Sequence, residues 1–134
     1  MRLLKILLLF MFLAGIAYSQ DEKKVFTAAV DKDGVQKVSV TGGSYFYDPA
    51  HIIVKVNVPV ELSVRKEPGI APHSFVIKAP EAGMDINEAL DKDPKVIKFV
   101  PQKTGKYPFY CDRRFLFFRT HRDKGMEGVM EVVE

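Results

Sequence analysis

Hydrophobic and polar residues alternate along most of the chain. Between residues 60 and 65, Val60, Leu62 and Val64 alternate with three polar residues. Such a repeat of two is typical of strands that bury one face. Further short apolar runs bounded by Gly, Pro or Asp lie at residues 35–40, 45–47, 52–56, 73–77, 95–100, 106–111 and 127–133. The pattern therefore predicts seven or eight short strands.

One stretch departs from this alternation. Asp85 and Glu88 stand three residues apart, as in a capping box at the start of a helix. Ile86 and Leu90 then lie on one face of a helical repeat. These features predict a short helix near residues 85–91.

Many short strands separated by Gly/Pro turns predict an all-β fold, specifically an antiparallel β-sandwich. The chain has 134 residues and no internal repeat. We expect one folded domain at residues 35–134, preceded by a charged lead-in at residues 20–34. A single cysteine provides no disulfide between the sheets, so this sandwich needs another stabilising element.

Residues 1–19 resemble a secretory signal peptide. Arg2 and Lys5 precede an apolar run, and Ala17-Tyr18-Ser19 forms a small-x-small cleavage site. The alternative is an uncleaved anchor, for which the apolar run is short. Cleavage removes 19 of the 134 residues and two of the twenty Lys and Arg, so the net charge falls from +3 to +1. We expect a periplasmic or secreted protein, and the small charge argues against nucleic-acid binding.

Cys111 is the only cysteine in the chain. In an exported protein it is either a free thiol, an intermolecular bridge or a metal ligand. An exposed free thiol is a liability in an oxidising compartment. We therefore favour metal coordination.

Three further donors accompany this thiol, and the full set is His73, Cys111, His121 and Met126. Thiolate and thioether sulfur are soft and imidazole is intermediate, a combination that suits both Cu(I) and Cu(II). We expect the first three to form a plane and Met126 to be a long axial ligand. The alternatives considered are His51 for the second histidine, and Met130 or Met84 for the methionine.

The motifs at residues 71–75 (APHSF), 105–111 (GKYPFYC) and 121–128 (HRDKGMEG) resemble those of the cupredoxins, the type 1 or blue copper proteins. Residues 47–62 look like their N-terminal half. The resemblance spans about residues 35 to 134. It implies a Greek-key β-sandwich or barrel, one type 1-like copper ion, and the four ligands named above. It also implies one-electron transfer between redox partner proteins, without catalysis.

Two features differ from the usual cupredoxin pattern. Nine residues, 112–120, separate Cys111 from His121, where family members commonly have only a few. Ser74 stands where the family commonly has an asparagine that hydrogen-bonds across the ligand loops. Whether the long segment contains a helix is left open by its sequence.

The same segment carries both arginines and phenylalanines. We expect Arg113, Arg114 and Arg119 to steer an acidic redox partner by long-range electrostatics. Phe115 and Phe118 are expected to pack in a small local core. We do not expect membrane contact, and we expect a monomer.

Three other functions are compatible with the sequence. The first is copper buffering or delivery, although such proteins often use Met- and His-rich segments and two of the five methionines here lie in the leader. The second is an enzyme with an open copper position, and the third is a metal-free accessory domain. No acid, base or nucleophile constellation accompanies the ligand set.

Overall fold

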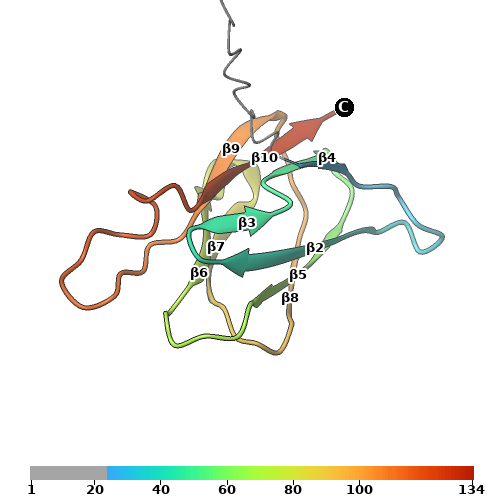
Figure 1. The fold of residues 1–134 in the computed structure, drawn as a ribbon. Helices are drawn as coiled ribbons and strands as arrows, with labels where there is room; N and C mark the ends of the chain where they lie inside the picture. The colour runs from blue at the N-terminus through green and yellow to red at the C-terminus, as the bar shows by residue number, and fades with distance from the viewer. Residues whose placement is uncertain (1–23) are drawn as a thin grey trace, which may run out of the picture.

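The alternating runs form two sheets that pack face to face (Figure 1). The computed structural model describes residues 24–134, and the predicted signal peptide lies outside this range. One sheet has the order β1-β4-β10-β9-β6-β7 and the other has the order β3-β2-β5-β8. The six strands of the first sheet are β1 (Val25–Thr27), β4 (His51–Lys55), β10 (Glu127–Val133), β9 (Gly105–Tyr110), β6 (Ser74–Ala79) and β7 (Met84–Ala89). The four strands of the second sheet are β3 (Phe46–Asp48), β2 (Gln36–Gly43), β5 (Val60–Lys66) and β8 (Lys95–Phe99).

The expected β-sandwich is confirmed, but its sheets are mixed rather than antiparallel. Strand β2 pairs in parallel with β5, and β4 pairs in parallel with both β1 and β10. Between β2 and β5 the chain crosses to the other sheet, forms β4 and then returns. Parallel neighbours require such a crossover, whereas a short hairpin produces an antiparallel pair.

The helix predicted near residues 85–91 is wrong, because residues Met84–Ala89 form strand β7. Met84 and Ile86 are buried while Asp85 and Asn87 are exposed, which is the period of a strand. All six residues of β7 pair with β6, and this tertiary pairing overrides the capping-box pattern. The only helical segment in residues 24–134 is a 3₁₀ turn at Pro80–Ala82.

The residues ahead of position 35 also take part in the fold. Val25–Thr27 form β1, which extends the larger sheet by pairing with β4. Val30 bridges to Gln36, at the start of β2. Edge strand β1 therefore lies within the predicted lead-in. No helix in residues 24–134 has the length and hydropathy required to cross a bilayer.

The core between the sheets extends as far as the candidate site. Phe75 and Phe109 stack with ring centroids 4.8 Å apart, and the Tyr47 ring meets both edge-on. Cys111 and Met126 belong to the same buried cluster. Cys111 thus lies on the core side, as its parity with Phe109 predicts.

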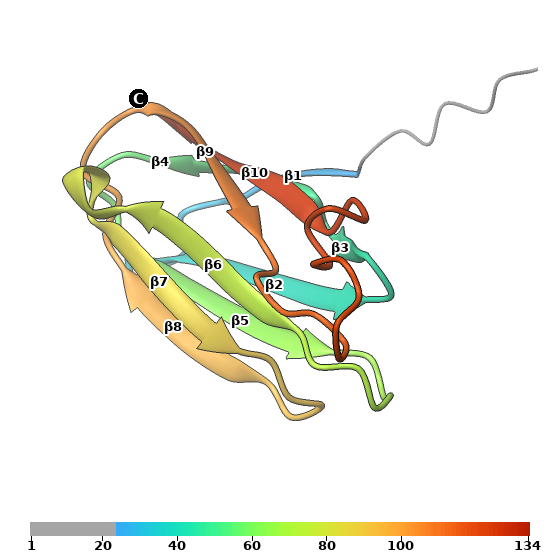
Figure 2. The ribbon, with the colours of Figure 1, turned by 90° about the vertical axis from the view of Figure 1, so that its left-hand side faces the viewer.

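The two segments that carry the candidate ligands meet at one end of the sandwich. Figure 2 shows the red segment between β9 and β10 at the same end as the loop from β5 to β6. The 3₁₀ turn and the C-terminus lie at the opposite end. The fold therefore brings residue 73 close to residues 111–126.

Replacing Leu62 with alanine should lower the free energy of unfolding by about 2 to 5 kcal/mol, because this fully buried side chain would leave a cavity. Val96→Ala, on the neighbouring strand β8, is the control, since Val96 is 57% exposed. It should change stability by less than about 0.5 kcal/mol. Urea unfolding measures both values, and equal losses would contradict the assigned core.

Candidate metal centre

Backbone pairing brings the candidate ligands together from distant parts of the sequence. Strand β6 pairs with β9 through Val76 and Tyr110. This pairing places His73, just before β6, beside Cys111, just after β9. His121 lies in the segment between β9 and β10, where its N–H donates to the Arg113 carbonyl at 2.8 Å. This hydrogen bond joins the two ends of the long insert at residues 112–120.

The donor atoms of His73, Cys111 and His121 converge on one point. The two histidine Nδ1 atoms are 3.1 Å apart, and the Cys111 Sγ lies 3.6 Å from the His121 Nδ1. All three donors lie within 4.8 Å of one another. Bonds of about 2.0–2.1 Å to nitrogen and 2.3 Å to sulfur leave neighbouring donors about 3 to 4 Å apart around one ion. The side chains therefore fit a single metal ion.

Burial keeps both imidazoles in the form that binds metals. Desolvation, with the charges of His121 and Lys66 as smaller causes, lowers the pKa of His73 to about 4. Desolvation also lowers the pKa of His121, with Lys124 contributing. A neutral imidazole offers a lone pair, whereas an imidazolium does not. At neutral pH both rings are ready to bind an ion without losing a proton.

Ser74 connects the two ligand segments. Its N–H donates to the Cys111 Sγ at 3.4 Å, and its hydroxyl donates to the Asp112 carboxylate at 2.7 Å. The Asp112 N–H in turn donates to the Ser74 hydroxyl oxygen at 3.0 Å. The single hydroxyl hydrogen goes to the carboxylate, since Sγ is farther away at 3.7 Å. Ser74 therefore does join the loops, with Asp112 as its partner.

Met126 is held by backbone hydrogen bonds to two of the candidate ligands, His121 and Cys111. Its N–H donates to the His121 carbonyl at 2.9 Å, and its carbonyl accepts from the Cys111 N–H at 3.2 Å. The side chain is fully buried. Gly125 before it has φ 98°, a conformation that favours glycine. A Cβ at Gly128 would lie 2.3 Å from the Phe109 ring, so this position also requires glycine.

The alternative ligands lie elsewhere. His51 pairs with Glu131 at 2.7 Å, on strands β4 and β10. Met130 is buried in the core beside Tyr107 on β9. Met84 pairs with Ala79, five residues along β6 from Ser74, which corresponds to roughly 17 Å. His121 is thus the second histidine of the cluster.

A family model described as a cupredoxin-like domain matches residues 5–126 of the chain. The chain belongs to the cupredoxin-like family. Family membership and the donor set together indicate one copper ion as its cofactor. No curated protein sequence matches the chain.

Solved structures agree with this assignment. The metal-binding domain of a Cu(I)-exporting P-type ATPase from Streptococcus pneumoniae D39, solved with Cu(I), is 25% identical, with TM-score 0.62. The match covers 84% of this cupredoxin and 98% of that domain. A copper-binding protein in its apo form is also 25% identical, with TM-score 0.55 and coverage of 80% and 95%. Auracyanin from Roseiflexus castenholzii, at 19% identity, TM-score 0.58 and coverage of 80% and 99%, shares the fold.

Tyr47 is a supporting residue that the sequence did not single out. Its hydroxyl donates to the carbonyl of Ser74, the residue whose N–H reaches the thiol. Burial raises the pKa of Tyr47 well above its usual value, with smaller effects from Cys111 and Asp112. The phenol therefore stays protonated and keeps donating. Its place just before the Asp48-Pro49 turn, in the stretch that resembles the N-terminal half of the family, was the available signal.

The insert at residues 112–120 is irregular and contains no helix. The expected mini-core of Phe115 and Phe118 is wrong, since these side chains are 39% and 49% exposed. They line an open depression of about 340 Å³ together with Tyr45, Ile70, Ala71, His121 and Lys124. Both phenylalanines therefore remain partly at the surface.

His121 contributes to this depression although only 1% of its surface is exposed. Its Nδ1 faces His73 and Cys111, and its Nε2 makes no hydrogen bond to residues 24–134. No side-chain nitrogen or oxygen in that range is both buried and without a partner. The His121 ring lies at the depression, where the Tyr45 ring packs edge-on against it with centroids 5.3 Å apart.

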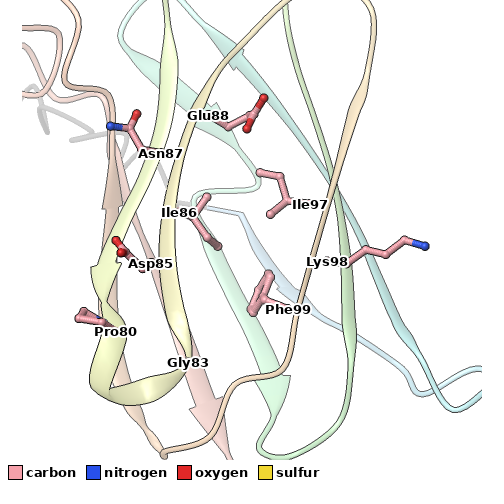
Figure 3. Close-up of a pocket in the computed structure, with 9 residues that line it drawn as sticks. All are labelled: Pro80, Gly83, Asp85, Ile86, Asn87, Glu88, Ile97, Lys98 and Phe99. Carbon is pink, nitrogen blue, oxygen red and sulfur yellow. The ribbon is translucent and has the colours of Figure 1, made fainter.

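A larger cleft, of about 590 Å³, lies between the edge strands β7 and β8. Figure 3 shows Ile86, Ile97 and Phe99 between these strands. No histidine or cysteine lines this cleft. Its lining does not indicate a metal site.

Acid should destabilise the metal-free protein between pH 6.5 and about 4. In this window the unfolded chain binds a proton at His73 that the folded chain does not, so the free energy of unfolding falls as the pH falls. Urea unfolding at pH 7 and at intermediate acid pH values measures the slope. His73→Gln should make the free energy of unfolding depend less on pH. An unchanged slope would show that other groups cause the loss of stability in acid.

Proposed function

We propose that this protein is an exported one-electron carrier whose copper ion alternates between Cu(II) and Cu(I). The observation that carries the proposal is the burial of the whole donor set. His73, Cys111, His121 and Met126 are each less than 8% exposed. Ligands enclosed in a packed core move little when the charge on an ion changes, and a small rearrangement favours fast electron transfer.

Each ligand has a distinct role in this proposal. His73, Cys111 and His121 would hold the ion as two neutral imidazoles and one thiolate. Met126 would be the weak axial ligand that adjusts the reduction potential. The Ser74 N–H stabilises negative charge on the sulfur, since a hydrogen bond to the charged form favours that form.

The same enclosure supports a carrier rather than an enzyme. A catalytic metal site keeps an open position for a substrate. Here the candidate ligands lie within the core cluster or directly beside it. Electrons could instead pass through the His121 ring, which lines the same depression as Phe115 and Phe118.

We also propose that a redox partner approaches this end of a monomeric protein. The predicted signal peptide supports export to the periplasm or beyond. Arg113, Arg114 and Arg119 belong to the insert beside His121, where their charge would accelerate encounter with an acidic partner. Steering of this kind acts over about 8–10 Å and needs no direct contact.

Copper delivery is the second candidate. Two of the structural relatives at 25% identity are the metal-binding domain of a Cu(I)-exporting ATPase and a copper-binding protein. Delivery requires the ligands to exchange with those of a partner. The burial of the donors favours the carrier, while these relatives keep delivery as the alternative.

Adding Cu(II) to the purified protein should give intense visible absorption from thiolate-to-copper charge transfer, with a small copper hyperfine splitting in EPR. Cys111→Ser should abolish the colour, because it removes the thiolate. The carrier should also be reduced and reoxidised without releasing copper to a chelator. A colourless complex that yields its copper readily would favour delivery.

Met126→Leu should retain the colour and raise the reduction potential, since loss of a thioether ligand weakens the binding of Cu(II) more than that of Cu(I). Met130→Leu is the matched control, because both methionines are fully buried. A Met→Leu substitution in a core usually lowers the free energy of unfolding by less than about 1.5 kcal/mol. Voltammetry measures both potentials. A shift in Met130→Leu alone would overturn the axial assignment.

A further inference from the structure

The insert presents an apolar tip at the metal end. We define the apolar tip as residues 115–118, which form a turn closed by the Phe118 N–H donating to the Phe115 carbonyl at 3.1 Å. Leu116 and Phe117 occupy its two corners and are 67% and 86% exposed. Figure 1 shows the loop between β9 and β10 projecting beyond the strands.

The tip contradicts ordinary turn chemistry. Leu116 has φ 54°, a left-handed conformation that turns normally assign to Gly or Asn. The chain places a large apolar residue there and exposes it and its neighbour to water. A residue whose backbone conformation conflicts with the preference of its residue type is expected mainly at functional sites. The tip therefore suits a surface that takes up apolar side chains.

Positive charge surrounds the tip. Residues 112–124 contain five cationic side chains and two acidic ones. Arg114 and Arg119 flank the tip, are exposed and have no carboxylate within 4 Å among residues 24–134. Lys124 lies 5.7 Å from the Phe118 ring centroid. A guanidinium offers a planar set of donors that matches phosphate oxygens.

We propose that the apolar tip docks on an anionic lipid surface, with Leu116 and Phe117 entering the interfacial region and Arg114 and Arg119 binding headgroup phosphates. Amphipathic segments with aromatic and aliphatic residues beside arginines bind membranes in this way. This replaces the expectation from the sequence that the protein makes no membrane contact.

The shape of the surface favours lipid over a protein partner. Stable protein–protein interfaces bury a large, closely packed area, and a single projecting turn offers little area of this kind. Mobile lipid chains can instead rearrange around a narrow apolar turn. Ile70, 90% exposed, lines the depression next to Phe115 and Phe118 and extends the apolar surface. Docking there would hold the His121 side of the protein close to the membrane, so the redox partner proposed above would have to meet the protein at that surface.

The test is flotation of the full mature chain with vesicles of equimolar phosphatidylcholine and phosphatidylglycerol, compared with pure phosphatidylcholine. Mass spectrometry should first confirm removal of residues 1–19, because a retained leader would bind lipid by itself. The wild type should bind the anionic vesicles preferentially. Leu116→Ser/Phe117→Ser should weaken binding at least about tenfold, from the loss of apolar burial. Arg114→Glu/Arg119→Glu should weaken binding to a similar degree.

Val25→Ser/Val96→Ser is the matched control, since both valines are more than half exposed and lie outside the insert. It should bind as the wild type does. The visible copper band of each variant checks folding and tests the carrier proposal separately. Equal binding by the tip variant, or no wild-type binding to anionic vesicles, would overturn the proposal. Tip-dependent electron exchange with a soluble acidic cytochrome, without vesicle binding, would assign the tip to a protein partner instead.

Discussion

Two imidazole nitrogens held 3.1 Å apart beside a thiol are the arrangement on which the rest of the structure depends. Unconstrained side chains would not keep this arrangement, because in solution each nitrogen would hydrogen-bond to water instead. The β6–β9 pairing, the Ser74 bonds and the aromatic stack under Cys111 fix the two ligand segments relative to each other. The packed sandwich thus fixes the positions of the donor atoms relative to one another.

This preorganisation links stability to function. A carrier gains from ligands that keep their positions in both oxidation states, and a packed interior provides that resistance to movement. The metal-free protein loses stability as the pH falls, because it must keep two imidazoles uncharged in the core. A bound ion would join the segments beside β6, β9 and β10, which belong to the same sheet, so the contact between the two sheets rests on the buried core.

Much of this was predictable from the sequence because it rests on local pattern and on donor chemistry. Alternation at Val60, Leu62 and Val64 identifies a strand without knowledge of its partners, and the thiol, imidazoles and thioether indicate copper by type. Strand β7 was misassigned because pairing with β6, not local preference, decides its conformation. Phe115 was misplaced for a related reason. Its sequence shows an apolar residue but not whether any neighbour lies close enough to cover it.

The hydrogen bond between the His121 N–H and the Arg113 carbonyl also bears on how such a protein can change. It joins the two ends of the insert immediately before the His121 imidazole, so the residues between them form a closed loop. The length and residue types of this loop can vary while the imidazole keeps its position. A long loop between cysteine and histidine is therefore compatible with an ordinary ligand geometry, and the loop can take on a separate function.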